Sequence, residues 1–251
     1  MRHDQQSQAQ FSPQAQAYLH SAVHAQGGDL ARLAALVRPG QQVLDLGCGA
    51  GHVAFHCAQA GAVVTACDPA PGMLAVVGKE AAERGLNVGT VQALAEGLPF
   101  EDGQFDQVFT RFSAHHWHSV PLALREVARV LKPGGSLVVV DVVASESPLA
   151  DTALQTLEML RDPSHVRDYR VSEWLAMLAD AGLRAQPMQE HDLWPLTMQF
   201  DVWTARMKTS ATRVAALREV LAQLPEEVKQ ELAVQPEGHF NLTVAWLAAW
   251  R

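Results

Sequence analysis

The chain has 251 residues, of which 48% are hydrophobic and 18% charged, as in folded globular proteins rather than disordered or fibrous ones. Lys and Arg number 19 against 27 Asp and Glu, and the resulting net charge of −8 disfavours a nucleic-acid partner. No apolar run approaches the roughly 18–20 residues of a membrane-spanning helix, and the Gln-rich start has no secretory signal. Three cysteines without a CxxC pair fit a reducing compartment, so we expect a cytoplasmic protein without a membrane partner.

Strands and helices are predicted to alternate once the N-terminal region has passed. Residues 1–12 are polar, and we expect them to be disordered. A helical pattern follows over 13–37. Strand-like apolar runs then cover 43–46, 63–67, 88–92, 105–112 and 137–142, and helix-like stretches cover 52–60, 72–84 and 120–131. This alternation predicts βαβ units with right-handed crossovers and a mostly parallel sheet.

The C-terminal part of the chain has a less regular pattern. Residues 144–169 are mixed and polar, and no element is predicted there. Further on, the pattern predicts helices over 171–181, 211–224 and 226–232, and strands over 183–187, 191–196 and 241–248.

The sharpest pattern is the segment VLDLGCGAGH at 43–52, in which an apolar strand leads through a glycine-rich loop into a helix. Gly47, Gly49 and Gly51 allow a sharp turn and a close approach of the backbone to a ligand. The start of the following helix offers N–H groups to electron-rich atoms. Such loops also occur as plain strand-to-helix connections, so this pattern alone does not identify a ligand.

An acidic residue, Asp68, ends the next predicted strand about twenty residues after the loop, where a carboxylate can accept both hydroxyls of a ribose. This spacing fits dinucleotides and also S-adenosylmethionine. His52 replaces the last small residue of the dinucleotide fingerprint, and Asp45 suits an ammonium group better than a pyrophosphate. We therefore expect a ligand that is cationic at one end and a ribonucleoside at the other, and an NAD-dependent oxidoreductase is disfavoured.

At this point the chain resembles the class I S-adenosylmethionine-dependent methyltransferases, and within them the small bacterial ubiquinone/menaquinone-biosynthesis-like (methyltransferase type 11) group. The resemblance covers about 40–142 and is carried, in the family's order and spacing, by four segments: VLDLGCGAGH (43–52), ACDPAPGML (66–74), ALAEGLPFEDGQFDQVFTRFSAHHW (93–117) and ALREVARVLKPGGSLVVVD (123–141).

The resemblance implies a role for each matching residue in binding the methyl donor. The three loop glycines would surround the amino-acid end of the donor, and Asp45 would hold its ammonium group. Asp68, followed by Pro69, would accept the ribose hydroxyls, and Met73 would pack on the adenine face. Ala95 and Glu96 would meet the adenine edge. The family usually has Asp where this chain has Leu94, which removes a side-chain hydrogen bond to the adenine amino group.

Two histidines, His115 and His116, follow the fourth predicted strand and are the candidates for a general base. An imidazole with an ordinary pKa near 6.5 suits that role at neutral pH. Adjacent residues in an extended chain point in opposite directions, so one of the two would face the pocket, and we favour His116. The alternative is that both histidines cap or pack the next helix.

Other residues have a functional and a structural interpretation that the sequence leaves open. Arg111 would hold the donor's carboxylate or an anionic substrate, or form a salt bridge. Tyr18 would cover the cofactor or pack within a helix. The segment RDPSHVRDYR at 161–170 would contact substrate or form a solvated loop.

Metal binding and cysteine chemistry are both disfavoured. The pairs His20 with His24 and His52 with His56 have the i, i+4 spacing of metal ligands, but no HExxH, CxxC or carboxylate cluster accompanies them, so we expect no metal. The three cysteines lie in predicted cofactor-half elements, where burial is the default.

We therefore predict an α/β fold with a doubly wound, mostly parallel seven-stranded sheet and helical caps at both ends, formed by a single domain over 13–251. Residues 40–142 would bind the cofactor, and 143–251 would supply the substrate side and the closing strands. The predicted function is methyl transfer from S-adenosylmethionine to a small-molecule acceptor, releasing S-adenosylhomocysteine. The alternative is a non-catalytic sensor or scaffold that binds the same donor. The acceptor and the oligomeric state are not predicted.

Overall fold

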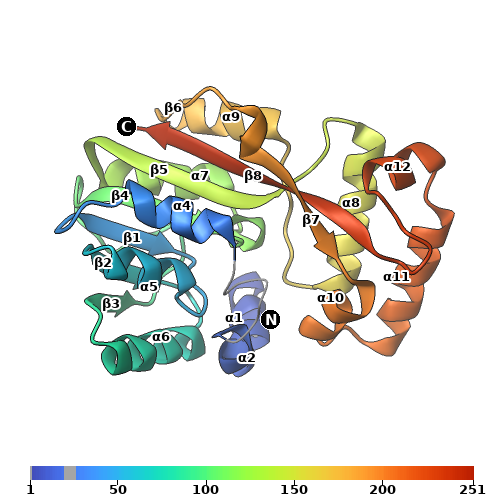
Figure 1. Ribbon diagram of the computed structural model, residues 1–251, viewed down its shortest axis with the longest axis horizontal. Coiled ribbons are helices and arrows are strands. Elements are labelled where there is room, and N and C mark those ends of the chain that lie inside the picture. Colours follow the sequence, from blue (N-terminus) through green and yellow to red (C-terminus); the bar gives the residue numbers. More distant parts are fainter. Residues whose placement is uncertain (1, 20–26) are drawn as a thin grey trace. The chain divides into compact units, whose positions relative to one another are not determined.

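The computed structural model describes residues 2–19 and 27–251, and the chain divides into two compact units (Figure 1). Unit 1 comprises 1–141, 176–187 and 246–251, and unit 2 comprises 142–175 and 188–245. Most of the chain after strand β5 (Leu131–Val143) is in unit 2, but residues 176–187 and 246–251 return to unit 1.

The sheet follows the doubly wound pattern that alternation predicts. Over the described ranges it has eight strands, in the order β3-β2-β1-β4-β5-β8-β6, with β7 paired to β8 outside that path. The first five strands pair in parallel, and β8 runs antiparallel to both β6 and β7. The main path therefore has the seven strands expected, and β7 is an addition. The strands are β1 (Gln42–Leu46), β2 (Val63–Cys67), β3 (Val88–Val91), β4 (Phe105–Arg111), β5 (Leu131–Val143), β6 (Arg184–Ala185), β7 (Leu193–Met198) and β8 (Phe240–Trp250).

Helices lie on both faces of the sheet in unit 1, with α4 and α5 in front of it in Figure 1 and α7 behind it. The helices here are α4 (Gly28–Leu36), α5 (His52–Gln59), α6 (Pro71–Arg84), α7 (Val120–Val130) and the end of α9 (Val171–Asp180). Helix α7 is a clear amphipathic case: Val120, Ala123, Leu124, Val127 and Val130 recur at helical spacing and are fully buried. Ser119 caps its start by accepting from the N–H of Leu122.

The N-terminal segment contains helical structure where disorder was expected. Helix α1 covers His3–Phe11, followed by a 3₁₀ turn, η1 (Ser12–Gln14), and helix α2 (Ala15–Leu19). The ring of Phe11 packs edge-on against Tyr18 and His116, with centroids 5.8 and 4.9 Å apart. These contacts reach far along the chain, so the polar composition of the segment gave no sign of them.

Unit 2 is mostly helical, and two of its helices were not predicted: α8 (Pro148–Arg161) and α10 (Phe200–Arg206). Helix α8 buries Ala150, Leu154 and Leu157 on one face, at the spacing of an amphipathic helix. Unit 2 also contains α11 (Ala211–Gln223), α12 (Glu226–Glu231), a 3₁₀ turn η3 (Glu190–Asp192) and the ladder of β7 with β8. Among the helices described in both units, none is long and apolar enough to cross a membrane.

Candidate functional site

The glycine loop between β1 and α5 holds all three of its glycines at positive φ, +70° at Gly47, +49° at Gly49 and +88° at Gly51. A Cβ atom on Gly47 would lie 2.6 Å from the Cβ of Ser113 and still closer to its hydroxyl. A Cβ atom on Gly49 would meet no protein atom within 4 Å. The first glycine is therefore required by the packing of the protein itself, whereas the second borders open space.

Two buried carboxylates flank this loop. Asp68 accepts from the N–H of Gly49 at 2.9 Å and from that of Ala70 at 2.8 Å, and Asp45 accepts from the N–H of Ala54 at 2.9 Å. Burial, with a smaller contribution from the nearby Asp68 carboxylate, raises the pKa of Asp45 to about 7. Burial likewise raises the pKa of Asp68 to about 6. Two acidic groups kept out of water in this way favour a cation or a hydroxyl donor as their neighbour.

The remaining residues of the predicted donor site range from buried to exposed. Met73 is in the first turn of α6 and is buried, and Ala95 is buried in the loop after β3. Glu96 accepts from the N–H of Ser119 at 2.9 Å, so its side chain supports the start of α7. Pro69 accepts from the side-chain amide of Gln92 at 3.0 Å, and Leu94 is largely exposed.

Arg111, at the end of β4, forms an ion pair with Asp29 in which both side chains are nearly buried. Its guanidinium also lies 4.6 Å from the ring centroid of Phe112. Of the interpretations that the sequence left open for Arg111, the structure contains the salt bridge. Tyr18 also has a structural contact, because its carbonyl oxygen lies 3.2 Å from Nε2 of His52.

The two candidate histidines lie in a 3₁₀ turn, η2 (Ala114–His116), and not in extended chain. Their ring centroids are only 4.2 Å apart, so the expectation that they point in opposite directions is wrong. Adjacent residues in a turn with three residues per turn are separated by about 120°, which allows their rings to touch. His116 packs edge-on against Phe11, while His115 makes a polar contact.

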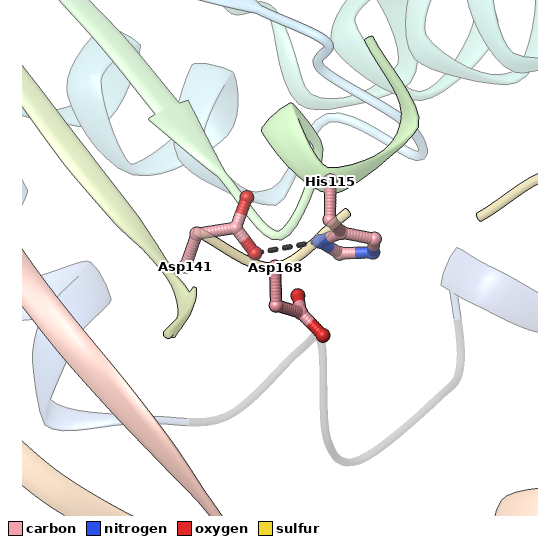
Figure 2. Close-up of side chains that lie close together, drawn as sticks. All are labelled: His115, Asp141 and Asp168. Atoms are coloured by element: carbon pink, nitrogen blue, oxygen red, sulfur yellow. Dashed lines mark hydrogen bonds and ion pairs between the residues drawn. The ribbon is translucent and has the colours of Figure 1, made fainter. Parts of the chain in front are cut away.

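That polar contact identifies a residue that sequence reasoning missed, Asp141, near the end of β5. Its Oδ1 lies 2.7 Å from Nδ1 of His115 (Figure 2). Its Oδ2 accepts from the N–H groups of Ala114 at 2.8 Å and Ser113 at 3.2 Å. Asp141 is 2% exposed. The sequence signal was an Asp after a run of three valines, where a strand reaches the ligand-binding edge of a parallel sheet.

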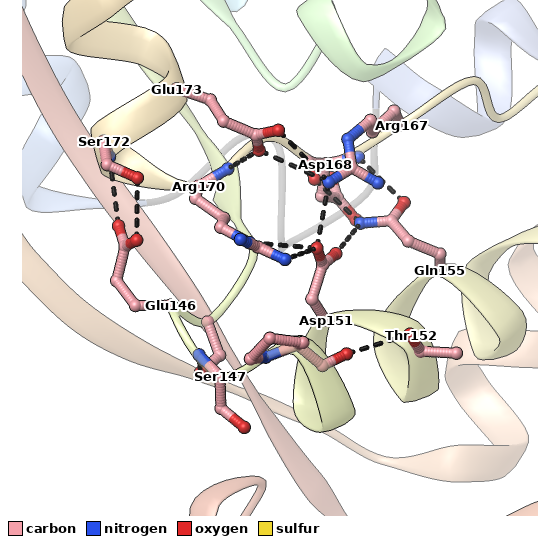
Figure 3. Close-up of polar contacts among 12 residues, drawn as sticks. Glu146, Ser147, Asp151, Thr152, Gln155, Arg167, Asp168, Arg170, Ser172 and Glu173 are labelled. Carbon is pink, nitrogen blue, oxygen red and sulfur yellow. Dashed lines mark hydrogen bonds and ion pairs between the residues drawn. The ribbon is translucent and has the colours of Figure 1, made fainter.

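The segment 161–170, where substrate contacts were one interpretation, is tied into unit 2 by a polar network centred on Asp151 of α8 (Figure 3). Asp151 accepts from Arg167 at 2.9 Å and Arg170 at 2.8 Å, and from Gln155 at 2.9 Å. Hydrogen bonds from these groups lower the pKa of Asp151, although burial opposes them. His165, which is buried, lies 3.1 Å from the amide oxygen of Gln155. The segment is therefore an ordered structural connection and not a solvated loop.

The histidine pairs considered for a metal have other contacts where the structure describes them. Nδ1 of His56 lies 2.8 Å from the carbonyl oxygen of His52, and His52 in turn contacts Tyr18. His20 and His24 fall outside the described residues. All three cysteines are unpaired and buried, and burial raises the pKa of each thiol, in Cys67 to about 12.

Comparison with known proteins places the glycine loop and the strands around it in a common context. The family described as a methyltransferase domain matches residues 44–139. The chain is 42% identical to the uncharacterized protein YafE of Escherichia coli over 200 residues. The aligned region covers 79% of this chain and 95% of YafE. It is 38% identical to the uncharacterized methyltransferase YcgJ of Bacillus subtilis, over 89% of this chain and 88% of YcgJ.

The similarity to YcgJ is also seen in three dimensions, and part of the chain is similar to an enzyme with a named activity. The crystal structure of YcgJ has a TM-score of 0.84 at 34% identity, covering 89% of this chain and 98% of that chain. A demethylmenaquinone methyltransferase from Thermus thermophilus is 41% identical over 109 residues, which are 43% of this chain and 50% of that protein.

Proposed function

Because the chain belongs to the family of S-adenosylmethionine-dependent methyltransferases, we propose that it methylates a small molecule and that the loop at Gly47–Gly51 holds the donor. The observation that carries the assignment of the site is the open space at Gly49, whose N–H group donates to the buried carboxylate of Asp68. A donor with an ammonium group and a ribose offers one partner to each of the two carboxylates, Asp45 and Asp68.

The residues of the site fit the donor chemically. Asp45 would bind the ammonium group, whose positive charge offsets the desolvation that raises the pKa of this carboxyl. Asp68 is fixed by two backbone N–H groups and would accept the ribose hydroxyls. Met73, Ala95 and the backbone beside Glu96 would surround the adenine. Arg111, engaged with Asp29, would support the loop rather than bind the donor directly.

The bound donor supplies a methyl group on a positively charged sulfur, so the protein's tasks are to align the acceptor, exclude water and accept a proton where the acceptor has one to lose. His115 and His116 would serve the last task. They belong to a turn that starts beside the loop, since Ser113 packs directly on Gly47.

Support for a small acceptor comes from unit 2 and from the charge of the chain. Unit 2 contains a pocket of about 440 Å³ that is open to solvent on one side, within the size range of pockets that bind small organic molecules. Its lining is mostly apolar, with two carboxylates, Glu146 and Glu231. The net charge of −8 disfavours nucleic acid as the acceptor.

Calorimetric titration with S-adenosylmethionine and S-adenosylhomocysteine tests the donor site. We expect micromolar binding that is weakened at least tenfold by Asp68→Ala. Asp102→Ala, which removes a largely exposed carboxylate, is the matched control and should bind as the natural protein does. Binding that survives Asp68→Ala would refute the assignment of the site.

A screen with methyl-labelled donor then tests turnover on phenols, amines, thiols and quinol-like carbon acids. Transfer of label to a small molecule supports the proposal. Donor binding without transfer to any member of the panel would favour a sensor or scaffold.

A further inference from the structure

We propose that His115, and not the adjacent His116, is the general base of the methyl transfer, and that Asp141 is the residue that positions it. The inference rests on the proposed function and adds to it the identity of the base and its orienting partner. It derives from the contacts of η2, β4 and β5, all within unit 1.

The first step is that the chain leading into the turn of His115 packs against the donor loop. A side chain on Gly47 would collide with Ser113, and the indole N–H of Trp117 donates to the Ser113 hydroxyl at 3.1 Å. Ser113 therefore packs directly against the first glycine of the loop. His115 follows two residues later in the same short turn, so its ring is carried on backbone that contacts the donor site.

The second step is that Asp141 is held in place by the sheet and by the turn. Strands β4 and β5 are paired up to Arg111 and Val140, and the N–H of Phe112 donates to the carbonyl of Val140 at 2.8 Å. Phe112 itself has a φ of +51°, a conformation that costs a non-glycine residue about 1 kcal/mol or more. The turn is stabilised in return by two N–H groups that donate to one oxygen of Asp141.

The third step is that the two oxygens of Asp141 have different partners. Oδ2 accepts from the backbone, and Oδ1 faces Nδ1 of His115 at 2.7 Å. An ionised carboxylate can only accept, so Nδ1 of His115 carries the hydrogen. The lone pair of the neutral ring then resides on Nε2, which is the tautomer that a base acting through Nε2 needs.

The chemistry follows from this tautomer. A lone pair of the acceptor atom forms the bond to the methyl carbon, and the carbon–sulfur bond breaks with its electrons passing to sulfur. The acceptor's proton passes to Nε2 of His115. The imidazolium that results is stabilised by Asp141 through Nδ1, and it later releases the proton to solvent. S-adenosylhomocysteine and the methylated acceptor are the products.

His116 has a different environment. Its ring packs edge-on against Phe11 of helix α1, at a centroid distance of 4.9 Å. This contact joins the N-terminal helix to η2. We choose His115 over His116 because of the carboxylate of Asp141 at Nδ1 of His115.

Asp141→Asn gives a sharp test because the position of its amide is determined by the turn. Two backbone N–H groups face the Oδ2 position, so the amide oxygen must remain there and the amide NH₂ must face Nδ1. Nδ1 then has to accept, and the hydrogen moves to Nε2. Nuclear magnetic resonance of protein labelled with ¹⁵N-histidine reads this tautomer directly, and His115→Gln assigns the signals.

We expect the Nδ1–H tautomer in the natural protein at about pH 8 and the Nε2–H tautomer in Asp141→Asn. Ser113→Ala is the matched control, because it perturbs the same turn through Trp117 and leaves the carboxylate in place, so it should retain Nδ1–H. An Nε2–H tautomer in the natural protein, or an unchanged tautomer in Asp141→Asn, overturns the proposal. The natural protein alone suffices for the first of these, should the variant fail to fold.

Turnover completes the test with the acceptor found in the screen. Asp141→Asn and His115→Gln should each lower kcat by about 10²–10⁴-fold, the usual contribution of a general base. The double variant should lose no more than either single variant, and the Kd for S-adenosylhomocysteine should stay within about twofold. If Asp141→Asn shows the Nε2–H tautomer of His115 and still turns over at the full rate, His115 is not the general base. Absence of donor binding in the natural protein would instead refute the proposed function. The tautomer of His115 could still be measured, because that measurement needs no bound donor.

Discussion

Replacing Asp45 by Asn should make the ligand-free protein more stable at high pH while weakening its binding of the donor. Asn has nearly the same shape, and its amide oxygen can still accept the hydrogen bond from the N–H of Ala54. What the substitution removes is a buried carboxyl that is 2% exposed and whose pKa is raised to about 7.

The magnitude follows from the difference between this pKa and the ordinary value of 3.8, at about 1.4 kcal/mol for each pH unit. Between those two pKa values the folded state retains a proton that the unfolded state has lost, so the free energy of unfolding falls as pH rises through this window. The loss is complete above about pH 7 and amounts to at most about 4 kcal/mol. At about pH 5 it is roughly 2 kcal/mol.

Thermal unfolding at the two pH values is the assay. For a chain of this size 1 kcal/mol shifts Tm by about 2–4 °C, so Asp45→Asn should raise Tm by up to about 8–16 °C near pH 8 and by about half of that near pH 5. Calorimetric titration should show weaker binding of S-adenosylhomocysteine to the variant. A Tm below that of the natural protein at pH 8 would refute the reasoning. So would a change in Tm that is the same at both pH values.

Three further outcomes are expected. Gly49→Ala should fold, lose about 1–2 kcal/mol of stability because of its left-handed backbone, and bind the donor more weakly. Gly47→Ala should lose more stability, because the new methyl group clashes with Ser113. Equal melting temperatures for the two variants would contradict this. Arg161→Ala should destabilise by about 3–5 kcal/mol in urea unfolding, since it leaves Glu158 charged and buried, and Glu158→Gln in the same background should restore part of that loss. The three buried thiols should not react with a chromogenic disulfide reagent at pH 8 until urea unfolds the protein; fast labelling of the native protein would show that they are accessible.

Sequence reasoning predicted what short stretches of chain determine. The loop conformation at Gly47 and Gly49 depends on backbone freedom, and the position of Asp68 depends on the period of one βαβ unit; both are local properties. The strands and α-helices from β1 to β5 were predicted to within a few residues for the same reason, apart from the early start of β5 at Leu131.

The pairing of His115 with Asp141 could not be predicted in this way. The two residues are 26 positions apart, and their contact depends on the register between β4 and β5 and on the turn at Phe112. The ion pair of Arg111 with Asp29 spans 82 positions and likewise depends on how the elements pack.

Helix α8 is a different case, because the sequence contains a pattern that indicates a helix there, although none was predicted. Ser147 followed by Pro148 is a helix-start pattern, and the apolar residues behind it recur at helical spacing. The many charged and polar residues between them obscured that period. The charges instead form the network around Asp151 that orders the following segment.

Strand β8 also determines how the polypeptide can be divided. Its first half, up to Ala245, belongs to unit 2 and pairs with β7, and its second half, from Trp246, belongs to unit 1 and pairs with β6. The chain passes between the units after residues 141, 175, 187 and 245, so neither unit is a continuous stretch that one cut could release. A truncation anywhere between residues 141 and 240 removes β8 and leaves the central sheet without its closing strand. Exchange of unit 2 between relatives would therefore require two grafted segments, 142–175 and 188–245. The junction after residue 245 would fall inside strand β8.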